Sequence, residues 1–405
     1  MSVRLTAHGT AGPGLHETVL GKVCRMAQPA ERRGNYLLLL DEPFAPGGPK
    51  PDLSGYAGVV AGFGLPATLR ASCGVPLVDG VTPLDHLRDE DVVALHPNGL
   101  VRTHFRVGSA HNFLFATARC NSYCLMCSQP PQRADDTARL REHLRLLELI
   151  DPATEQLGIT GGEPTLLKDG LLLIVRRAKE QLPGTALHIL SNGRLFYYGS
   201  FARELAAIGH PDLMIGVPLY SPLDAEHDYV VQEAGAFDQT VVGLQNLGRF
   251  GVPVEIRVVV HRQTFSRLRE LGEFIYRNFA FVAQVVFMGL ERTGFAVSNF
   301  ADLWIDPWEY RKELGAATTF LALRGVEVGI YNLPLCLVPQ ELWRFCRRSI
   351  SDWKNEYLPV CETCAVRRLC GGFFSSALPR ALSQHILPIV SEPMSVGAVQ
   401  TRSAG

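Results

Sequence analysis

The sequence predicts an α/β protein whose central part is a partial or complete (β/α) barrel. From about residue 109 to 322, apolar stretches typical of strands alternate with helix-like stretches, as in a parallel sheet covered by helices. Residues 1–108 carry strand-like stretches without such alternation, and cysteines gather between residues 323 and 380. We therefore expect a β-rich N-terminal domain, the barrel, a cysteine-rich domain and a tail at residues 381–405.

The barrel is expected to contain six strands. Their sequences are FLFATA (113–118), QLGIT (156–160), ALHIL (186–190), DLMIGV (212–217), VEIRVVV (254–260) and AQVVFM (283–288). Between the first two, Leu140, Leu144 and Leu147 lie on one face of a predicted helix, with Asp136 as its N-cap. In a βα barrel the chemistry lies in the loops that follow the carboxyl ends of the strands.

The N-terminal domain is predicted from three strand-rich stretches. These are YLLLL (36–40), YAGVVAGFG (56–64) and DVVALHPNGLVRTHFR (91–106). The third is expected to fold as a hairpin about Asn98-Gly99, because Asn-Gly suits the left-handed backbone of a tight hairpin turn. This domain could recognise a partner or substrate.

The composition and charge of the chain limit the classes of partner and the compartment that we expect. A net charge of −1 gives no reason to expect nucleic acid or an anionic membrane surface as a partner. We find no signal peptide and no apolar run long enough to span a membrane, so we expect a cytoplasmic protein. Thiols stay reduced in that compartment, and the ten cysteines are therefore expected to be metal ligands more often than disulfides.

The first cysteine group, CNSYCLMC, follows the first predicted barrel strand directly. It contains Cys120, Cys124 and Cys127. A [4Fe–4S] cluster takes one thiolate per iron, so three cysteines leave one iron free to bind an amine and a carboxylate. The methionyl end of S-adenosylmethionine (SAM) offers both groups. The alternative is a zinc site completed by a distant His or Cys.

The loop after the second strand, in GITGGEPTL (158–166), is the second candidate. Gly161 and Gly162 permit close backbone approach, and Glu163 supplies a carboxylate for a ligand ammonium group. With CNSYCLMC, this loop resembles the CxxxCxxC and GGEP motifs of the radical SAM enzymes, over about residues 112–375. The resemblance implies that the three cysteines and Glu163 are the catalytic set.

The resemblance also implies further SAM contacts. Ser191 and Asn192, in SNG after the third strand, match the ribose-binding loop of the family. Arg257 lies in the fifth strand, where the family places a residue that reaches the SAM carboxylate. Met126 stands where the family usually has an aromatic residue, and its backbone is expected to contact adenine.

A second cysteine group lies near the C-terminus, in CETCAVRRLCGGFF (361–374). The five thiols between residues 336 and 370 indicate a metal site, either an iron–sulfur cluster or a four-cysteine zinc. The segment resembles the SPASM and twitch auxiliary-cluster domains of radical SAM peptide maturases. Because Phe374 stands at a further cysteine position of the full pattern, one auxiliary [4Fe–4S] cluster is expected. Its ligands would be Cys361, Cys364, Cys370 and Cys336, with Cys346 as the reserve.

The wider text of both cysteine segments is similar to the His-Xaa-Ser-system radical SAM maturases (HxsC-type). The similarity lies in the stretches CNSYCLMCSQPP, GITGGEPTLL and SDWKNEYLPVCETCAVRRLCGGFF. This implies a peptide or protein substrate, in particular a His-Xaa-Ser repeat protein, together with a second maturase and an electron donor such as flavodoxin or ferredoxin. Two alternatives stay open, namely a radical SAM enzyme for a small molecule or nucleoside and a non-catalytic zinc-binding protein.

Overall fold

The structure is a computed structural model of the 405-residue chain. It describes residues 5–44, 51–133, 135–348, 355–378 and 382–390. Of the predicted tail, residues 381 and 391–405 therefore lie outside the described residues. No helix in the described part is both long and apolar enough to cross a membrane.

The N-terminal domain is built on one eight-stranded sheet with the order β1-β8-β7-β3-β4-β5-β6-β2. The strands are β1 (Thr6–His8), β2 (Thr10–Ala11), β3 (Val19–Cys24), β4 (Tyr36–Leu40), β5 (Gly58–Ala61), β6 (Leu77–Asp79), β7 (Val92–Leu95) and β8 (Leu100–Phe105), with the short helix α1 (Ala67–Ser72) after β5. Strands β7 and β8 pair antiparallel, and Gly99 between them has φ +80°, so the predicted hairpin is confirmed. Because only Gly9 separates the outer strands β1 and β2, the sheet curls around its own core.

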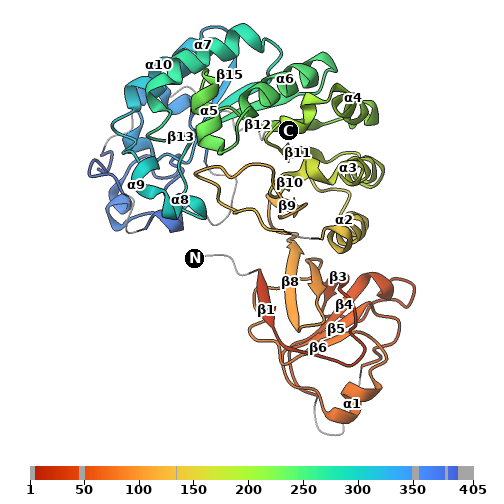
Figure 1. Ribbon diagram of the computed structural model, residues 1–405. Helices are drawn as coiled ribbons and strands as arrows, with labels where there is room; N and C mark the ends of the chain where they lie inside the picture. Colours follow the sequence, from red (N-terminus) through yellow and green to blue (C-terminus); the bar gives the residue numbers. More distant parts are fainter. Residues whose placement is uncertain (1–4, 45–50, 134, 349–354, 379–381, 391–405) are drawn as a thin grey trace.

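The central part is a seven-stranded parallel sheet with the order β15-β14-β13-β12-β11-β10-β9 (Figure 1). The strands are β9 (Asn112–Phe115), β10 (Gln156–Thr160), β11 (Ala186–Leu190), β12 (Leu213–Pro218), β13 (Val254–Val260), β14 (Gln284–Gly289) and β15 (Glu327–Tyr331). The outermost strands β9 and β15 do not pair with each other. The fold is therefore α/β, and of the two predicted forms it is the partial barrel.

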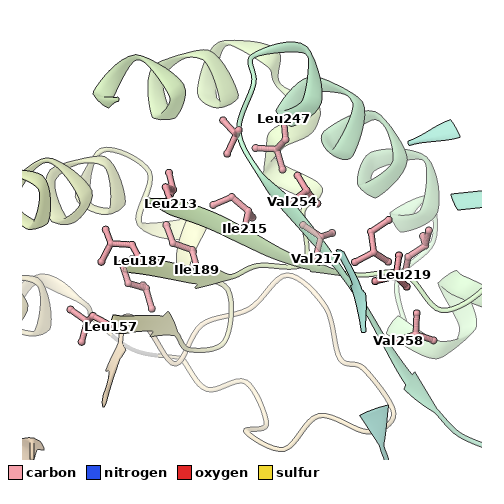
Figure 2. Close-up of a cluster of buried hydrophobic side chains, with 14 of the residues drawn as sticks. Leu157, Leu187, Ile189, Leu213, Ile215, Val217, Leu219, Leu247, Val254 and Val258 are labelled. Carbon is pink, nitrogen blue, oxygen red and sulfur yellow. The ribbon is translucent and has the colours of Figure 1, made fainter. Parts of the chain in front are cut away.

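Helices connect the strands of this sheet, and the longer ones cover one of its faces (Figure 1). They are α2 (Thr137–Leu149), α3 (Asp169–Gln181), α4 (Gly199–Ile208), α5 (Asp224–Val231), α6 (Ala236–Arg249), α7 (Leu268–Asn278), α8 (Phe295–Ser298), α9 (Phe300–Leu303) and α10 (Arg311–Ala322). Figure 2 shows strand residues such as Leu213, Ile215 and Val254 beside Leu247 of α6. All four are buried, and burial of each such side chain stabilises the fold by about 2 kcal/mol. Packing of the helices against the sheet fixes the orientation of the strands, and therefore the position of the loops at their carboxyl ends.

Two details differ from the sequence predictions. The sheet has a seventh strand, β15, which pairs parallel with β14 although it lies within the segment expected to be cysteine-rich. Asp136 stands at the N-cap position of α2, but its side chain makes no capping hydrogen bond. Its carboxylate instead accepts hydrogen bonds from Thr117 Oγ1 at 2.8 Å and Arg119 Nε at 2.6 Å. The Asp136 carboxylate therefore binds the loop after β9 instead of the backbone N–H groups at the start of α2.

The described part of the C-terminal segment is mostly irregular and carries four short 3-10 helices. These are η5 (Leu335–Leu337), η6 (Gln340–Phe345), η7 (Pro359–Thr363) and η8 (Ser375–Ala377). Cys346 forms an isolated parallel bridge with Ile330 of β15. Leu335, Leu342 and Val366 belong to the same buried cluster as the sheet core. The second cysteine group is therefore attached to the last strand of the partial barrel.

The two sheets meet along β8, β9 and α2, and His104 and His143 lie at this junction. Burial lowers the pKa of His104 to about 3, assisted by nearby positive groups, and lowers the pKa of His143 to about 4. Both rings are therefore neutral in the folded protein at pH 7 and remain so well below the pH at which an unfolded histidine is protonated, about 6.5.

This difference predicts that the protein loses stability as the pH falls below about 6.5. The unfolded chain then binds protons that the folded chain cannot accept until the pH approaches 4, so each histidine contributes a loss of up to about 2 kcal/mol at pH 5. Urea unfolding of the wild type and of His104→Gln between pH 7 and pH 5 measures the effect. The variant should show the shallower decline in unfolding free energy; equal slopes would contradict the prediction.

Candidate active site

The three cysteines of the first group lie on one loop after β9, and that loop is held from several sides. Tyr123 and Leu125 donate backbone hydrogen bonds to Val231 O and Val230 O of α5, at 3.1 and 2.9 Å. Asn299 Nδ2 donates to Leu125 O at 2.9 Å. These contacts with α5 and Asn299 fix the path of the segment between Cys120 and Cys127.

The thiols of this loop share one neighbourhood. Burial raises the pKa of Cys124 to about 12, and the nearby Cys120 and Cys127 thiols add to the effect. Burial likewise raises the pKa of Cys120 to about 11, with Glu163 as the next contributor. Metal binding would have to displace these protons, because the thiolate is the form that ligates metal. The structure therefore brings the three cysteines and Glu163 together, as the sequence motifs predict.

The Gly-Gly-Glu turn after β10 lies against the cysteine loop through backbone contacts. Gly162 N donates to Thr117 O and Glu163 N donates to Arg119 O, both at 2.7 Å. A Cβ atom on Gly161 would lie 2.4 Å from Thr117 O, and one on Gly162 would lie 2.2 Å from Arg119 O. Only glycine fits at these two positions, because real Cβ atoms do not approach a carbonyl oxygen so closely.

The Glu163 side chain connects the loop after β10 with the loop after β11 through hydrogen bonds. Its Oε1 accepts hydrogen bonds from Thr165 N at 2.9 Å, Thr165 Oγ1 at 2.5 Å and Ser191 Oγ at 2.8 Å, and its Oε2 accepts from Asn192 N at 2.6 Å. The side chain is fully buried, and burial raises its pKa while these hydrogen bonds act in the opposite direction. The predicted residues Glu163, Ser191 and Asn192 are thus in direct contact. The prediction that Glu163 binds a ligand ammonium group stays a prediction.

Sequence reasoning missed Arg194, which anchors the cysteine loop from the far side. The residue is buried, and its guanidinium donates to Asn121 O, and to Ser122 Oγ at 3.0 Å. Its position is held by Gln239 Oε1 at 2.8 Å and by an ion pair with Glu233 at 3.3 Å. An arginine directly after the SNG turn, at the end of a strand, was the available signal.

Tyr220 and Met126 lie beside the cysteines in a separate buried cluster. Met126 packs there with Tyr220, Val230 and Ala296. Burial raises the pKa of Tyr220, and the nearby Cys124 thiol contributes next. The side chain of Met126 is therefore part of an apolar cluster beside the cysteine loop, and the adenine contact expected of its backbone stays a prediction.

Arg257 points to the same side of β13 as Glu255. It forms an ion pair with Glu255, and its Nη2 lies 3.1 Å from Met288 Sδ. Glu255 is buried and also accepts a hydrogen bond from Gln284 Nε2. The predicted contact between Arg257 and a SAM carboxylate would therefore have to compete with Glu255, and it stays a prediction.

The cysteines of the second group also lie close to one another. Burial raises the pKa of Cys336 to about 12, followed by the effects of Cys370 and Cys361, and burial raises that of Cys346 to about 12, followed by Cys370. Cys370 Sγ accepts hydrogen bonds from Leu335 N at 3.3 Å and Gly372 N at 3.4 Å. Both candidates for a fourth ligand thus lie near Cys370, and the choice between Cys336 and Cys346 stays open.

The donor chemistry of the first group suits an iron–sulfur cluster. Among the described residues, no three Cys, His, Asp or Glu side chains are placed to hold one metal ion. A [4Fe–4S] cluster has a different requirement, because each of its irons takes its own thiolate. Cys120, Cys124 and Cys127 offer three thiolates on one loop, and the Gly161-Gly162 backbone lies directly against the start of that loop.

The family comparison agrees with this site. Residues 114–275 match the family model described as the radical SAM superfamily. The matched residues include all three cysteines, the Gly-Gly-Glu turn and Arg194. This part of the chain therefore matches the radical SAM superfamily, and it contains the whole of the first candidate site.

Particular relatives match only part of the chain. GTP 3′,8-cyclase of Nautilia profundicola is 26% identical over 184 residues, which are 44% of this chain and 55% of that protein. PqqA peptide cyclase of Granulibacter bethesdensis is 28% identical over 162 residues, 39% of this chain and 41% of that protein. The chain thus spans about half, or less, of the curated relatives it matches. The crystal structure of Streptococcus suis SuiB aligns with a TM-score of 0.45 at 15% identity, over 64% of this chain and 57% of that one.

Proposed function

We propose that this protein is a radical SAM maturase that modifies a peptide or protein substrate. The observation that carries the proposal is the meeting of three thiols with the Gly-Gly-Glu turn at the carboxyl ends of β9 and β10. When bound there, a [4Fe–4S] cluster would supply the electron that cleaves SAM and yields a 5′-deoxyadenosyl radical able to abstract a substrate hydrogen.

The residues of the chain have positioning roles in this proposal. Cys120, Cys124 and Cys127 hold the cluster, and the lack of side chains at Gly161 and Gly162 lets the Gly-Gly-Glu turn lie directly against their loop. Glu163 fixes the turn against Ser191 and Asn192, whose polar groups would bind the ribose. Arg194 holds the cysteine loop so that the thiols keep their spacing when the cluster is inserted.

The substrate class rests on two supports. One curated relative is named a peptide cyclase, and five cysteines converge in the C-terminal segment as an auxiliary [4Fe–4S] site would require. Within this class we propose a His-Xaa-Ser repeat protein as the partner, with an electron donor such as flavodoxin or ferredoxin in the cytoplasm. An auxiliary cluster closed by four cysteines would accept an electron from the substrate, because it has no open iron for ligation.

A nucleotide substrate is the second candidate, because another curated relative is named GTP 3′,8-cyclase and matches over 184 residues. The two candidates predict different products from the same SAM cleavage. GTP would be changed in the absence of any peptide, whereas a maturase would leave it unchanged.

Mass spectrometry distinguishes these outcomes. The anaerobically purified protein is incubated with SAM and a reductant, together with either a His-Xaa-Ser repeat peptide or GTP. We expect a defined mass change in the peptide and none in GTP. A Cys127→Ser variant serves as the inactive control, and Cys73→Ser, which changes a cysteine of the N-terminal domain, serves as the matched active control. A change in GTP alone would overturn the peptide proposal and keep the radical SAM chemistry.

A further inference from the structure

A cavity of about 390 Å³ lies at the junction of the two sheets, apart from the candidate active site. It is bounded by β8 of the N-terminal domain, by the edge strand β9 and by the first half of α2, which meet there in Figure 1. The polar side chains that line it include His96, Arg102, Thr103, His104, Arg139 and His143. None of them belongs to the cysteine groups or to the loops that hold SAM in our proposal.

Five polar atoms of these side chains are buried without a hydrogen-bond partner among the described residues. They are His96 Nε2, Thr103 Oγ1, His104 Nε2, Arg139 Nε and His143 Nδ1. Thr103 is 7% exposed and His143 is 2% exposed. Unpartnered buried polar atoms are destabilising and few per domain, so five around one cavity indicate that something polar fills it.

The hydrogen-bonding roles of two of these atoms can be assigned. His143 Nε2 lies 3.0 Å from Phe115 O, and a carbonyl oxygen only accepts, so Nε2 carries the proton. In the neutral ring Nδ1 is then an acceptor and needs a donor from the occupant. Arg139 Nε is a donor only and needs an acceptor. The occupant must therefore offer both a hydrogen-bond acceptor and a hydroxyl or a similar donor.

The charges around the cavity favour an anionic acceptor. Arg102, Arg106 and Arg139 face it, against Asp135 and Glu142. Asp135 already accepts hydrogen bonds from the backbone and side chain of Thr137, at 3.0 and 2.7 Å. Within the described residues, neither Arg102 nor Arg139 has a carboxylate at ion-pair distance. The Arg139 guanidinium is instead held 5.2 Å from the centre of the Phe115 ring, and the N-terminal half of α2 adds a favourable dipole for an anion.

We propose that this cavity binds a small ligand that carries a carboxylate or phosphate group together with a hydroxyl. The anionic group contacts Arg102 and Arg139, and the hydroxyl donates to His143 Nδ1. Phe113 and Phe115 supply the apolar wall. The site lies between the β-rich domain and the radical SAM domain, so a bound ligand holds the two together. This inference does not depend on the proposed substrate.

The test uses the full chain, in the presence of saturating SAM so that the active site is filled. Inorganic phosphate, citrate and AMP are the anionic probes, and glycerol is the uncharged hydroxyl control. Thermal unfolding and titration calorimetry are run at constant ionic strength. We expect at least one anion to bind saturably and raise the unfolding midpoint, and glycerol to leave the midpoint unchanged.

Variants decide whether the effect belongs to this cavity. Arg102→Gln and Arg139→Gln should each weaken binding of the active probe at least about tenfold, the expected cost of one charged hydrogen bond. Arg177→Gln on α3, whose side chain pairs with Glu180 on the surface, is the matched control and should bind like the wild type. Arg102 is an exposed residue, so its variant should fold even if Arg139→Gln does not. No saturable binding, or binding that both cavity variants retain, would overturn the proposal and mean that the cavity holds water or an adventitious ion only.

Discussion

Replacing Cys124 by alanine is expected to abolish SAM cleavage while the C-terminal cysteine group keeps its iron. Cys124 is the middle thiol of its group, and both neighbouring thiols influence its pKa. Its loop is held to α5 by backbone hydrogen bonds. A cluster with two thiolates would be lost, so the iron content should fall from roughly eight to about four per chain.

The measurement combines iron analysis of the anaerobically reconstituted protein with detection of 5′-deoxyadenosine after addition of SAM and dithionite. Cys73→Ala is the matched control, because it removes a thiol from the N-terminal domain and leaves both cysteine groups intact. Cleavage at the wild-type rate by the Cys124 variant would refute the assignment of the cluster. Loss of all iron would instead show that the two cysteine groups do not load independently.

Replacing Gly162 by alanine is expected to disrupt the site through sterics alone. The new Cβ would lie 2.2 Å from Arg119 O and 3.0 Å from Ala118 O, both of them backbone atoms that no side-chain rotation can move. The turn must shift away from the cysteine loop, which breaks the hydrogen bonds from Gly162 N and Glu163 N. We expect a loss of about 1–3 kcal/mol in unfolding free energy, as for other overpacked sites, and loss of SAM binding.

Gly184→Ala is the control for this variant. Gly184 precedes β11 in the same domain, and a Cβ there would meet no atom within 4 Å. Urea unfolding and equilibrium dialysis with SAM compare the two. If Gly162→Ala bound SAM as tightly as Gly184→Ala does, the close approach of the turn to the cysteine loop would not matter for the cofactor.

The barrel strands were the most predictable part of the fold. The predicted ranges QLGIT, ALHIL and VEIRVVV coincide with β10, β11 and β13, because each is a short, mainly apolar run whose residues include buried ones such as Ile159, Ile189 and Ile256. Strand β15 was missed because EVGIY is short, begins with an exposed glutamate and lies directly before the cysteine segment. Its place is set by pairing with β14, which is not a local property.

The sequence by itself determined the elements and the chemistry, namely the alternation of strands and helices, the cysteine spacing and the Gly-Gly-Glu turn. These depend on neighbouring residues, so local patterns contain them. Only the tertiary structure decided that Glu163 binds Ser191 and Asn192 and that Arg194 holds the cysteine loop. It also decided that Asp136 accepts a hydrogen bond from Thr117 instead of capping its helix, and that histidines and arginines surround one cavity between the sheets. Those contacts join residues from separate loops and strands, and their partners are chosen by the register and packing of the whole sheet.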